Sequence, residues 1–168
     1  VAGEDEYDEK EYIPVSENDV EEMYDELLGF IDSVKEPHLH ELLINSFEKN
    51  ESIKAKFKRR SAAKSIHHAF VGGLLEHTLS VTRICDFISK QYDYLDRDLL
   101  ITAAIFHDIG KINEFSEFPV NDYTDEGQLL GHIVMGYNYI FTEAGKIEGF
   151  PKCKKRELLH CILSHHGK

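Results

Sequence analysis

The sequence predicts an all-α protein that folds as a single helical domain. Apolar residues recur at every third or fourth position in several segments, which is the period of one helix face. No alternating apolar and polar run is long enough to indicate a strand, and there are only four prolines in 168 residues. A hydrophobic content of 42% suffices for one globular domain of this length with a buried core.

The first helix follows an acidic segment that lacks periodicity. Residues 1–15 begin without methionine, and we interpret them as a linker or tail cut from a longer protein, ahead of a domain over residues 16–168. Ser16 and Asp19 resemble an N-terminal capping box, so we expect a helix from about residue 17 to residue 34. Its apolar stripe consists of Val20, Met23, Leu27 and Ile31.

Two shorter helices come next. Pro37 suits a first helical turn, because the N–H that proline lacks would have no partner in the helix there. Residues 51–60 predict a short basic helix. The apolar stripe that follows Pro37 consists of Leu39, Leu42, Leu43 and Phe47.

Longer helices are expected in the second half of the chain. Periodicity predicts a helix over residues 69–92 and another over 97–108, followed by a polar loop at 113–128 and helices near 128–144 and 155–166. The inner face of the first of these helices is assigned to Leu74, Val81, Ile84 and Ile88.

Composition excludes several classes of protein. The longest apolar stretch covers residues 99–106, far below the roughly 20 residues of a membrane span, and no signal peptide is visible. We therefore expect a soluble, cytoplasmic protein without a membrane partner. The odd number of cysteines without CxxC spacing argues against a disulfide framework or a zinc–thiolate site. Reduced thiols that mostly fill the core are expected at Cys85, Cys153 and Cys161.

The net charge of −12 is unevenly distributed. Residues 1–48 hold 16 of the 31 acidic residues and 2 of the 19 basic ones, so the remainder is close to neutral. Two basic runs, residues 54–64 and 152–156, can each meet a phosphate backbone or form a solvated helix face. Phe57 within the first run has the composition of a single-strand-binding site, although an inward-packed ring is the alternative.

Histidines provide the main functional indication. Five of the ten lie among apolar neighbours at helical spacing and are expected to point inward: His77, His107, His132, His165 and His166. A single such histidine would be read as a hydrogen-bonded core residue. Asp108 also has apolar neighbours. Burying a carboxylate costs folding free energy unless a positively charged group or a metal ion lies beside it. Imidazole and carboxylate ligands together suit first-row divalent ions, so these residues predict a metal site.

The remaining histidines are interpreted differently. His38 and His40 are expected at the surface or behind the site, and His160 is also interpreted as a residue that does not bind the metal. His67 and His68 immediately precede the long helix. Of these two, His68 is kept as a candidate substrate-binding residue.

In chain order, these histidines and Asp108 lie within four longer motifs that resemble those of HD-domain metal-dependent phosphohydrolases. The motifs are HHAFVGGLLEHTLSV (67–81), HDIGKI (107–112), YTDEGQLLGHIVMG (123–136) and LLHCILSHHGK (158–168). Together they are similar to those of the YhaM-type 3′→5′ exoribonucleases, over about residues 16–168. The resemblance implies an HD-domain helical bundle, preceded in the full-length protein by an OB-fold that is missing here. It also implies a homo-oligomer as one possible assembly.

The resemblance also implies a ligand set. One ion would take His77, His107, Asp108 and a further aspartate beyond Lys168, so the domain is expected to be truncated at its C-terminus. Asp108 would bridge to a second ion, whose other ligands would be His132, His165 and His166. Mn²⁺ is the favoured ion, with Co²⁺, Fe²⁺, Zn²⁺ and Mg²⁺ as alternatives.

The chemistry expected is metal-assisted phosphodiester hydrolysis, with Asp108 and Lys111 as catalytic residues. Lys111 would also hold a phosphoryl oxygen of the substrate, and its alternative role is a helix-capping charge. Tyr123 and Thr124 are expected to border the substrate entrance, with a plain surface loop as the alternative.

The leading hypothesis is the catalytic domain of a 3′→5′ exoribonuclease acting on single-stranded RNA, with DNA as a further substrate to consider. The alternatives are hydrolysis of small nucleotides or cyclic dinucleotides, and a non-catalytic HD domain that binds a metal or another ligand.

Overall fold

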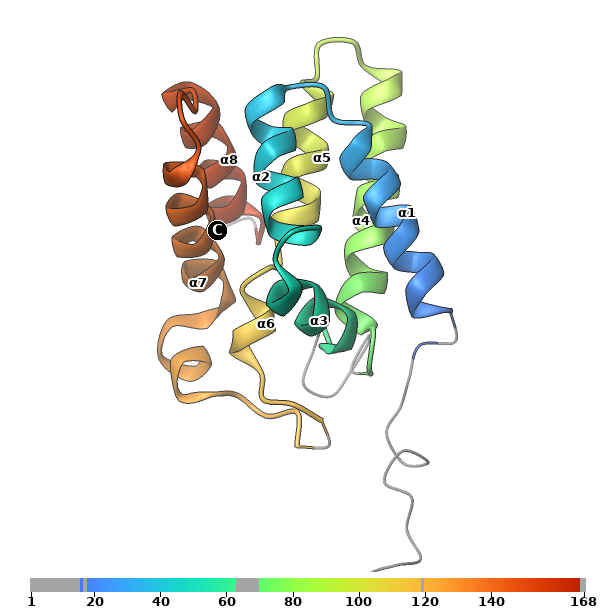
Figure 1. Cartoon of the computed structure of the whole chain (residues 1–168), viewed down its shortest axis with the longest axis vertical. Coiled ribbons are helices and arrows are strands. Elements are labelled where there is room, and N and C mark those ends of the chain that lie inside the picture. Colours follow the sequence, from blue (N-terminus) through green and yellow to red (C-terminus); the bar gives the residue numbers. More distant parts are fainter. Residues whose placement is uncertain (1–15, 17, 63–69, 119, 167–168) are drawn as a thin grey trace, which may run out of the picture.

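The computed structural model describes residues 16, 18–62, 70–118 and 120–166 (Figure 1). The linker expected at residues 1–15 lies outside this part. Within it the chain forms eight helices and no strand, with one isolated bridge between Phe115 and Tyr123. The all-α expectation is therefore confirmed. The helices are α1 (Val20–Asp32), α2 (Pro37–Phe47), α3 (Glu51–Arg59), α4 (Gly73–Gln91), α5 (Arg97–Phe106), α6 (Lys111–Glu114), α7 (Asp125–Lys146) and α8 (Lys152–Ser164).

The longer helices run roughly side by side, and α3 and α6 lie together toward one end of the bundle (Figure 1). Helix α5 packs against α4, α2 and α8, while α7 packs against α6 and α8. The stripe predicted on α2 is confirmed, since Phe47 and its apolar partners are fully buried. Phe57 also points inward, where its ring lies 5.1 Å from that of Phe47.

Helix α1 begins later than the sequence predicts. Its N-cap is Asp19, whose carboxylate accepts hydrogen bonds from the backbone N–H groups of Glu21 and Glu22. Ser16 does not take part in a capping box, because its hydroxyl donates to Glu76 on α4. The predicted capping box is therefore wrong, although the helix itself is present.

The face of α4 assigned to the core is partly wrong. Leu74 is buried, but Ile84 is 59% exposed and Ile88 is 39% exposed. The buried stripe lies next to the predicted one and includes Thr78 and Thr82, whose polarity hid it from a search for apolar residues. The Thr82 hydroxyl donates to the carbonyl of Thr78 at 2.8 Å, which satisfies one polar group inside the bundle.

The segment predicted as a polar loop, residues 113–128, contains the end of one helix and the beginning of another. Helix α6 ends inside it, and α7 already begins at Asp125, where the Thr124 hydroxyl accepts a hydrogen bond from the N–H of Gly127. Helix α7 is broken at Gly131, which adopts φ 72° and ψ 160°. No helix in the described ranges combines the length and apolarity that a bilayer span requires.

Candidate metal centre

Asp108 lies in a tight turn between α5 and α6. Helix α5 ends at Phe106, whose carbonyl accepts a hydrogen bond from the Ile109 N–H, and the Lys111 N–H donates to the carbonyl of Asp108. The side chains of Phe106 and Ile109 are buried, so core packing holds the turn in place. Asp108 is only 2% exposed, yet its carboxylate faces several histidine side chains.

Gly110 brings a second helix to this turn. A Cβ atom at Gly110 would lie 2.0 Å from the carbonyl oxygen of His132, so no larger residue fits without displacing the backbone. Gly131 supplies the break in α7 just before His132. These two glycines allow the backbone of α7 to approach closely and place the His132 ring beside Asp108.

Two groups of side chains lie on the two sides of the Asp108 carboxylate. On the Oδ2 side, Nε2 of His107 is 3.2 Å away and Nε2 of His77 is 3.4 Å away. Those two nitrogens are 3.1 Å from each other. Within this group one ligand atom from each residue lies within 4.8 Å of the others. The ammonium of Lys111 is also on this side, 2.9 Å from Oδ2.

The Oδ1 side holds the second group. Nε2 of His132 is 3.5 Å from Oδ1, and Nε2 of His165 is 3.7 Å from it. His166 completes the group, with its Nε2 3.0 Å from that of His132. The prediction that His166 points inward is only partly met, because this residue is exposed at the rim of the cluster.

Hydrogen bonds fix the tautomers of three of these rings. Nδ1 of His107 lies 2.7 Å from the Ala104 carbonyl, and Nδ1 of His165 lies 2.7 Å from the Ile162 carbonyl. A carbonyl only accepts, so Nδ1 must carry the proton and donate. Nδ1 of His132 similarly donates to Glu114 at 3.0 Å. In the neutral form of each ring, Nε2 therefore presents a lone pair toward Asp108.

This arrangement leaves polar atoms that a cation would satisfy. In the described part of the chain, Oδ1 of Asp108 and Nε2 of His165 are buried without a hydrogen-bond partner. Convergent lone pairs and a buried carboxylate repel one another in the absence of a positive charge. Nitrogen and carboxylate-oxygen ligands suit a first-row divalent ion, so the donor set fits a metal.

The charge state of the cluster supports the same conclusion. Burial acts to raise the pKa of Asp108, but the imidazoles of His107 and His165 and the ammonium of Lys111 hold it well below its usual range. Asp108 is therefore ionised at neutral pH. Interaction with this carboxylate raises the pKa of His165. Burial, together with the neighbouring histidines, lowers the pKa of His166.

Comparison with known proteins agrees with this geometry. The model of the HD domain family matches residues 74–168, which include both sides of the cluster. The chain belongs to the HD domain family. The family resemblance stated from the sequence is therefore confirmed. No solved structure matches the chain.

Curated relatives extend the match toward the N-terminus of the chain. It is 37% identical over 161 residues to the 3′-5′ exoribonuclease YhaM of Bacillus subtilis, covering 94% of this chain and 48% of that protein. Identity to YhaM of Shouchella clausii is 37% over 158 residues, covering 92% and 46%. YhaM of Bacillus velezensis is 36% identical over 161 residues, with coverage of 94% and 48%. The chain thus spans about half the length of the curated relatives it matches.

Glu114 is a residue of this HD domain that the sequence did not single out. It is 5% exposed, and its Oε1 accepts hydrogen bonds from both the backbone N–H and the Nδ1 of His132, each at 3.0 Å. It therefore orients the His132 ring. The only sequence signal was its place between the apolar residues Ile112 and Phe115, in a helix too short to show a period.

Lys111 and the predicted loop residues have local partners. Nζ of Lys111 donates to the Ala62 carbonyl at 2.8 Å, and the residue begins α6 rather than ending a helix. Thr124 donates its hydroxyl to the Asn113 carbonyl. Tyr123 is 44% exposed, and its ring centroid lies 5.0 Å from that of Phe115. His68 lies outside the described residues.

A cavity of about 510 Å³ opens beside the cluster. Its apolar wall includes Leu100 and Ala103 of α5, and its polar wall is formed by Asp108, Lys111 and four of the five cluster histidines: His77, His107, His165 and His166. Tyr123 and Thr124 do not line it, so their contact with substrate stays a prediction. The half-buried thiols of Cys85 and Cys161 pack against the core and line the apolar side, as expected for most of the thiols, whereas Cys153 is exposed. His38, His40 and His160 lie outside the cluster, as expected.

Proposed function

We propose that this HD domain is a metal-dependent phosphodiesterase and the catalytic part of a 3′→5′ exoribonuclease that acts on single-stranded RNA in the cytoplasm. The supporting observation is the pair of ligand groups on opposite oxygens of Asp108. A carboxylate with ligand groups on both of its oxygens would suit a two-metal site for phosphodiester hydrolysis. The exoribonuclease names of the curated relatives support the choice of substrate.

The residues fit two divalent ions, with Mn²⁺ favoured and Co²⁺, Fe²⁺, Zn²⁺ or Mg²⁺ as alternatives. His77, His107 and Oδ2 of Asp108 would hold one ion, and Oδ1 would share the second with His132, His165 and His166. When bound, such ions neutralise the phosphoryl oxygens and lower the pKa of a water molecule. Because His107, His165 and Lys111 keep the pKa of Asp108 low, its carboxylate is ionised at neutral pH and both oxygens are available to ions.

The remaining residues bind and orient the substrate. Two of the three N–H donors of Lys111 are used by Asp108 and Ala62, which leaves one for a phosphoryl oxygen. The apolar wall at Leu100 and Ala103 is suited to the ribose and base of the terminal nucleotide, and it excludes water from one side of the phosphate. A cavity of about 510 Å³ falls in the size range of small-ligand sites.

The direct test is hydrolysis of 5′-labelled single-stranded RNA by the 168-residue chain with Mn²⁺. We expect stepwise shortening of RNA with a free 3′ end and none of RNA with a blocked 3′ end. His107→Ala should abolish the activity, whereas His40→Ala, a histidine outside the cluster, should not change it. The proposal fails if the chain leaves RNA intact under conditions in which Bacillus subtilis YhaM degrades it. Release of phosphate from mononucleotides alone would support the small-nucleotide alternative instead.

A further inference from the structure

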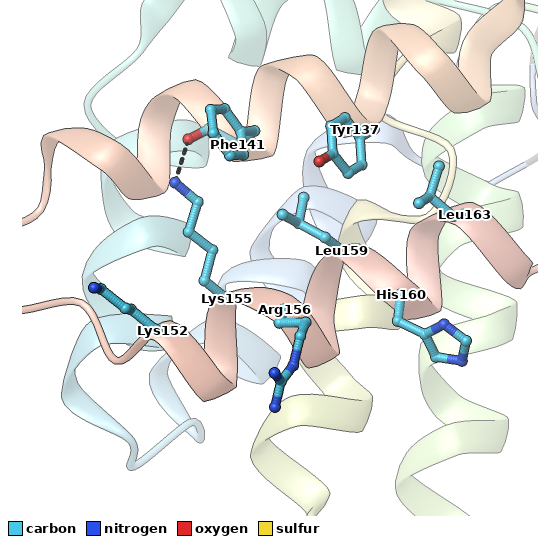
Figure 2. A pocket seen from close by; sticks show the side chains of 8 residues that line it. All are labelled: Tyr137, Phe141, Lys152, Lys155, Arg156, Leu159, His160 and Leu163. Atoms are coloured by element: carbon cyan, nitrogen blue, oxygen red, sulfur yellow. Dashed lines mark hydrogen bonds between the residues drawn. The ribbon is translucent and has the colours of Figure 1, made fainter.

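A second cavity, of about 460 Å³, lies between α7 and α8, apart from the metal centre (Figure 2). Tyr137 and Phe141 stand side by side on α7, with their rings within 12° of parallel and their centroids 6.0 Å apart. Figure 2 shows Leu159 and Leu163 pointing toward them from α8. Phe141 is 49% exposed and Leu163 is 48% exposed, so the wall of the cavity is an open apolar surface.

Basic side chains surround this aromatic surface. Nζ of Lys155 lies 3.9 Å above the ring of Phe141 and donates to its carbonyl, which holds the ring in place. Lys152 and Arg156 also line the cavity and are exposed. In Figure 2 the guanidinium of Arg156 extends away from α7 and from the two rings. No ion pair is found for Lys152 or Arg156 in the described part of the chain, so their charges are available to a ligand.

The two helices that form this groove also carry the Oδ1 side of the metal centre. His132 is nine residues before Phe141 on α7, and His165 is thirteen residues after Lys152 at the end of α8. At a rise of 1.5 Å per residue these separations correspond to about 14 Å and about 20 Å. These separations are measured along the helix axes, and they place the groove within reach of a strand of several nucleotides whose end lies at the metal centre and which passes around the helices.

We propose that the groove of Tyr137, Phe141, Lys152, Lys155 and Arg156 binds the single-stranded RNA that lies on the 5′ side of the nucleotide being removed. This inference rests on the proposed function. Bases would stack on the two rings, and phosphates would lie along the outer basic side chains. Stacked bases are spaced at about 3.4 Å, so a length of about 20 Å takes at most about six nucleotides.

Charge distribution favours this groove over the other basic run. Within residues 54–64, Lys58 is paired with Glu21, and Arg60 donates to the Ile112 carbonyl. Phe57 is fully buried there and offers no ring to a base. In the 152–156 run Lys154 is paired with Asp96. However, Lys152 and Arg156 are exposed, are unpaired among the described residues and lie near the exposed ring of Phe141, which is the combination that single-strand binding uses.

Binding and catalysis are measured separately to test the proposal. Affinity for a fluorescent 12-nucleotide RNA is measured by anisotropy in EDTA, so that no hydrolysis occurs. Hydrolysis of bis(p-nitrophenyl) phosphate with Mn²⁺ reports on the metal centre alone. The variants are Lys152→Ala/Arg156→Ala and Phe141→Ala, with Lys54→Ala/Arg59→Ala as a control of equal charge change in the other basic run.

We expect the first pair to lower RNA affinity about tenfold and to reduce its salt dependence, because two phosphate contacts are lost. Phe141→Ala should lower affinity about fivefold or more, through lost stacking. Cleavage of bis(p-nitrophenyl) phosphate should be unchanged in both. The proposal is overturned if these variants bind RNA as the wild type does, if the Lys54/Arg59 pair has the larger effect, or if the wild type binds no RNA. RNA binding at the groove without any hydrolysis would retain the groove as an RNA-binding site and reject the exoribonuclease activity.

Discussion

The two sides of Asp108 differ in how their polar atoms are satisfied. On the Oδ2 side the carboxylate already has a cation, because the Lys111 ammonium lies 2.9 Å away. On the Oδ1 side, neither Oδ1 nor Nε2 of His165 has a hydrogen-bond partner in the described structure. The Oδ1 side also has three histidines, whereas the Oδ2 side has two. We infer that the Oδ1 side holds its ion more tightly, and that the Oδ2 ion must share Asp108 with Lys111.

The two sides also depend on different parts of the fold. His107 is held by the carbonyl of its own helix, one turn earlier. The Oδ1 side depends on the close contact between Gly110 and the backbone of His132, and on the Glu114 carboxylate. Substitutions of Gly110 or Glu114 should therefore weaken ion binding on the Oδ1 side more than on the Oδ2 side, and this difference can be measured.

The largest effect is expected from Asp108→Asn, which keeps the shape of the side chain but removes the charge from both sides. Hydrolysis of bis(p-nitrophenyl) phosphate should fall by more than about a hundredfold, since even substitutions behind the ligands cost 10- to 100-fold. Circular dichroism should show an intact helical fold. If the variant retains more than about a tenth of the activity, Asp108 does not serve both sides.

Gly110→Ala should separate the Oδ1 side from Asp108. Its Cβ would collide with the His132 carbonyl oxygen, so we expect a loss of about 3 kcal/mol or more in the free energy of unfolding. Urea denaturation measures this change. Gly29→Ala is the matched control, because Gly29 lies on α1 with no atom within 4 Å of an added Cβ. That control should be neutral or stabilise the protein by about 0.5–1 kcal/mol. Equal effects at the two glycines would contradict the close contact.

His165→Ala and His77→Ala compare the sides directly. Competition with a chelator should show that His165→Ala weakens the more tightly held ion by about tenfold or more, because it removes one of three histidines around Oδ1. His77→Ala should leave that affinity within about threefold and weaken only the second ion. The reverse order would show that the Oδ2 side is the tighter one, despite Lys111.

Glu114→Gln should have the smallest effect. The amide can still accept from the His132 Nδ1–H, but the charge that makes the imidazole a better ligand is lost. We expect about a tenfold weaker Oδ1 ion with little change on the Oδ2 side, measured by the same competition. Glu117→Gln is the control, three residues away with a side chain that is 71% exposed, and it should have no effect. An identical result for both variants would reject the orienting role of Glu114.

The sequence predicted those features that repeat along a helix. The stripes on α1 and α2 were found because four apolar residues recur in each, and the cluster histidines were found because apolar neighbours surround them. The buried face of α4 was missed because threonines contribute to it. Helix α6 has four residues and therefore no detectable period, so Glu114 was overlooked. The contact of Gly110 with His132 joins two helices and has no local signal in the sequence.

The most direct test of the account is the metal content of the purified chain, measured by elemental analysis after incubation with Mn²⁺ and removal of free ions. The wild type should retain one ion on each side of Asp108, or one alone if the Oδ2 ion dissociates, and Asp108→Ala should retain almost none. A wild type that carries no metal, or an Asp108→Ala variant that keeps the full amount, would contradict the bridging role on which both the site and the proposed function depend.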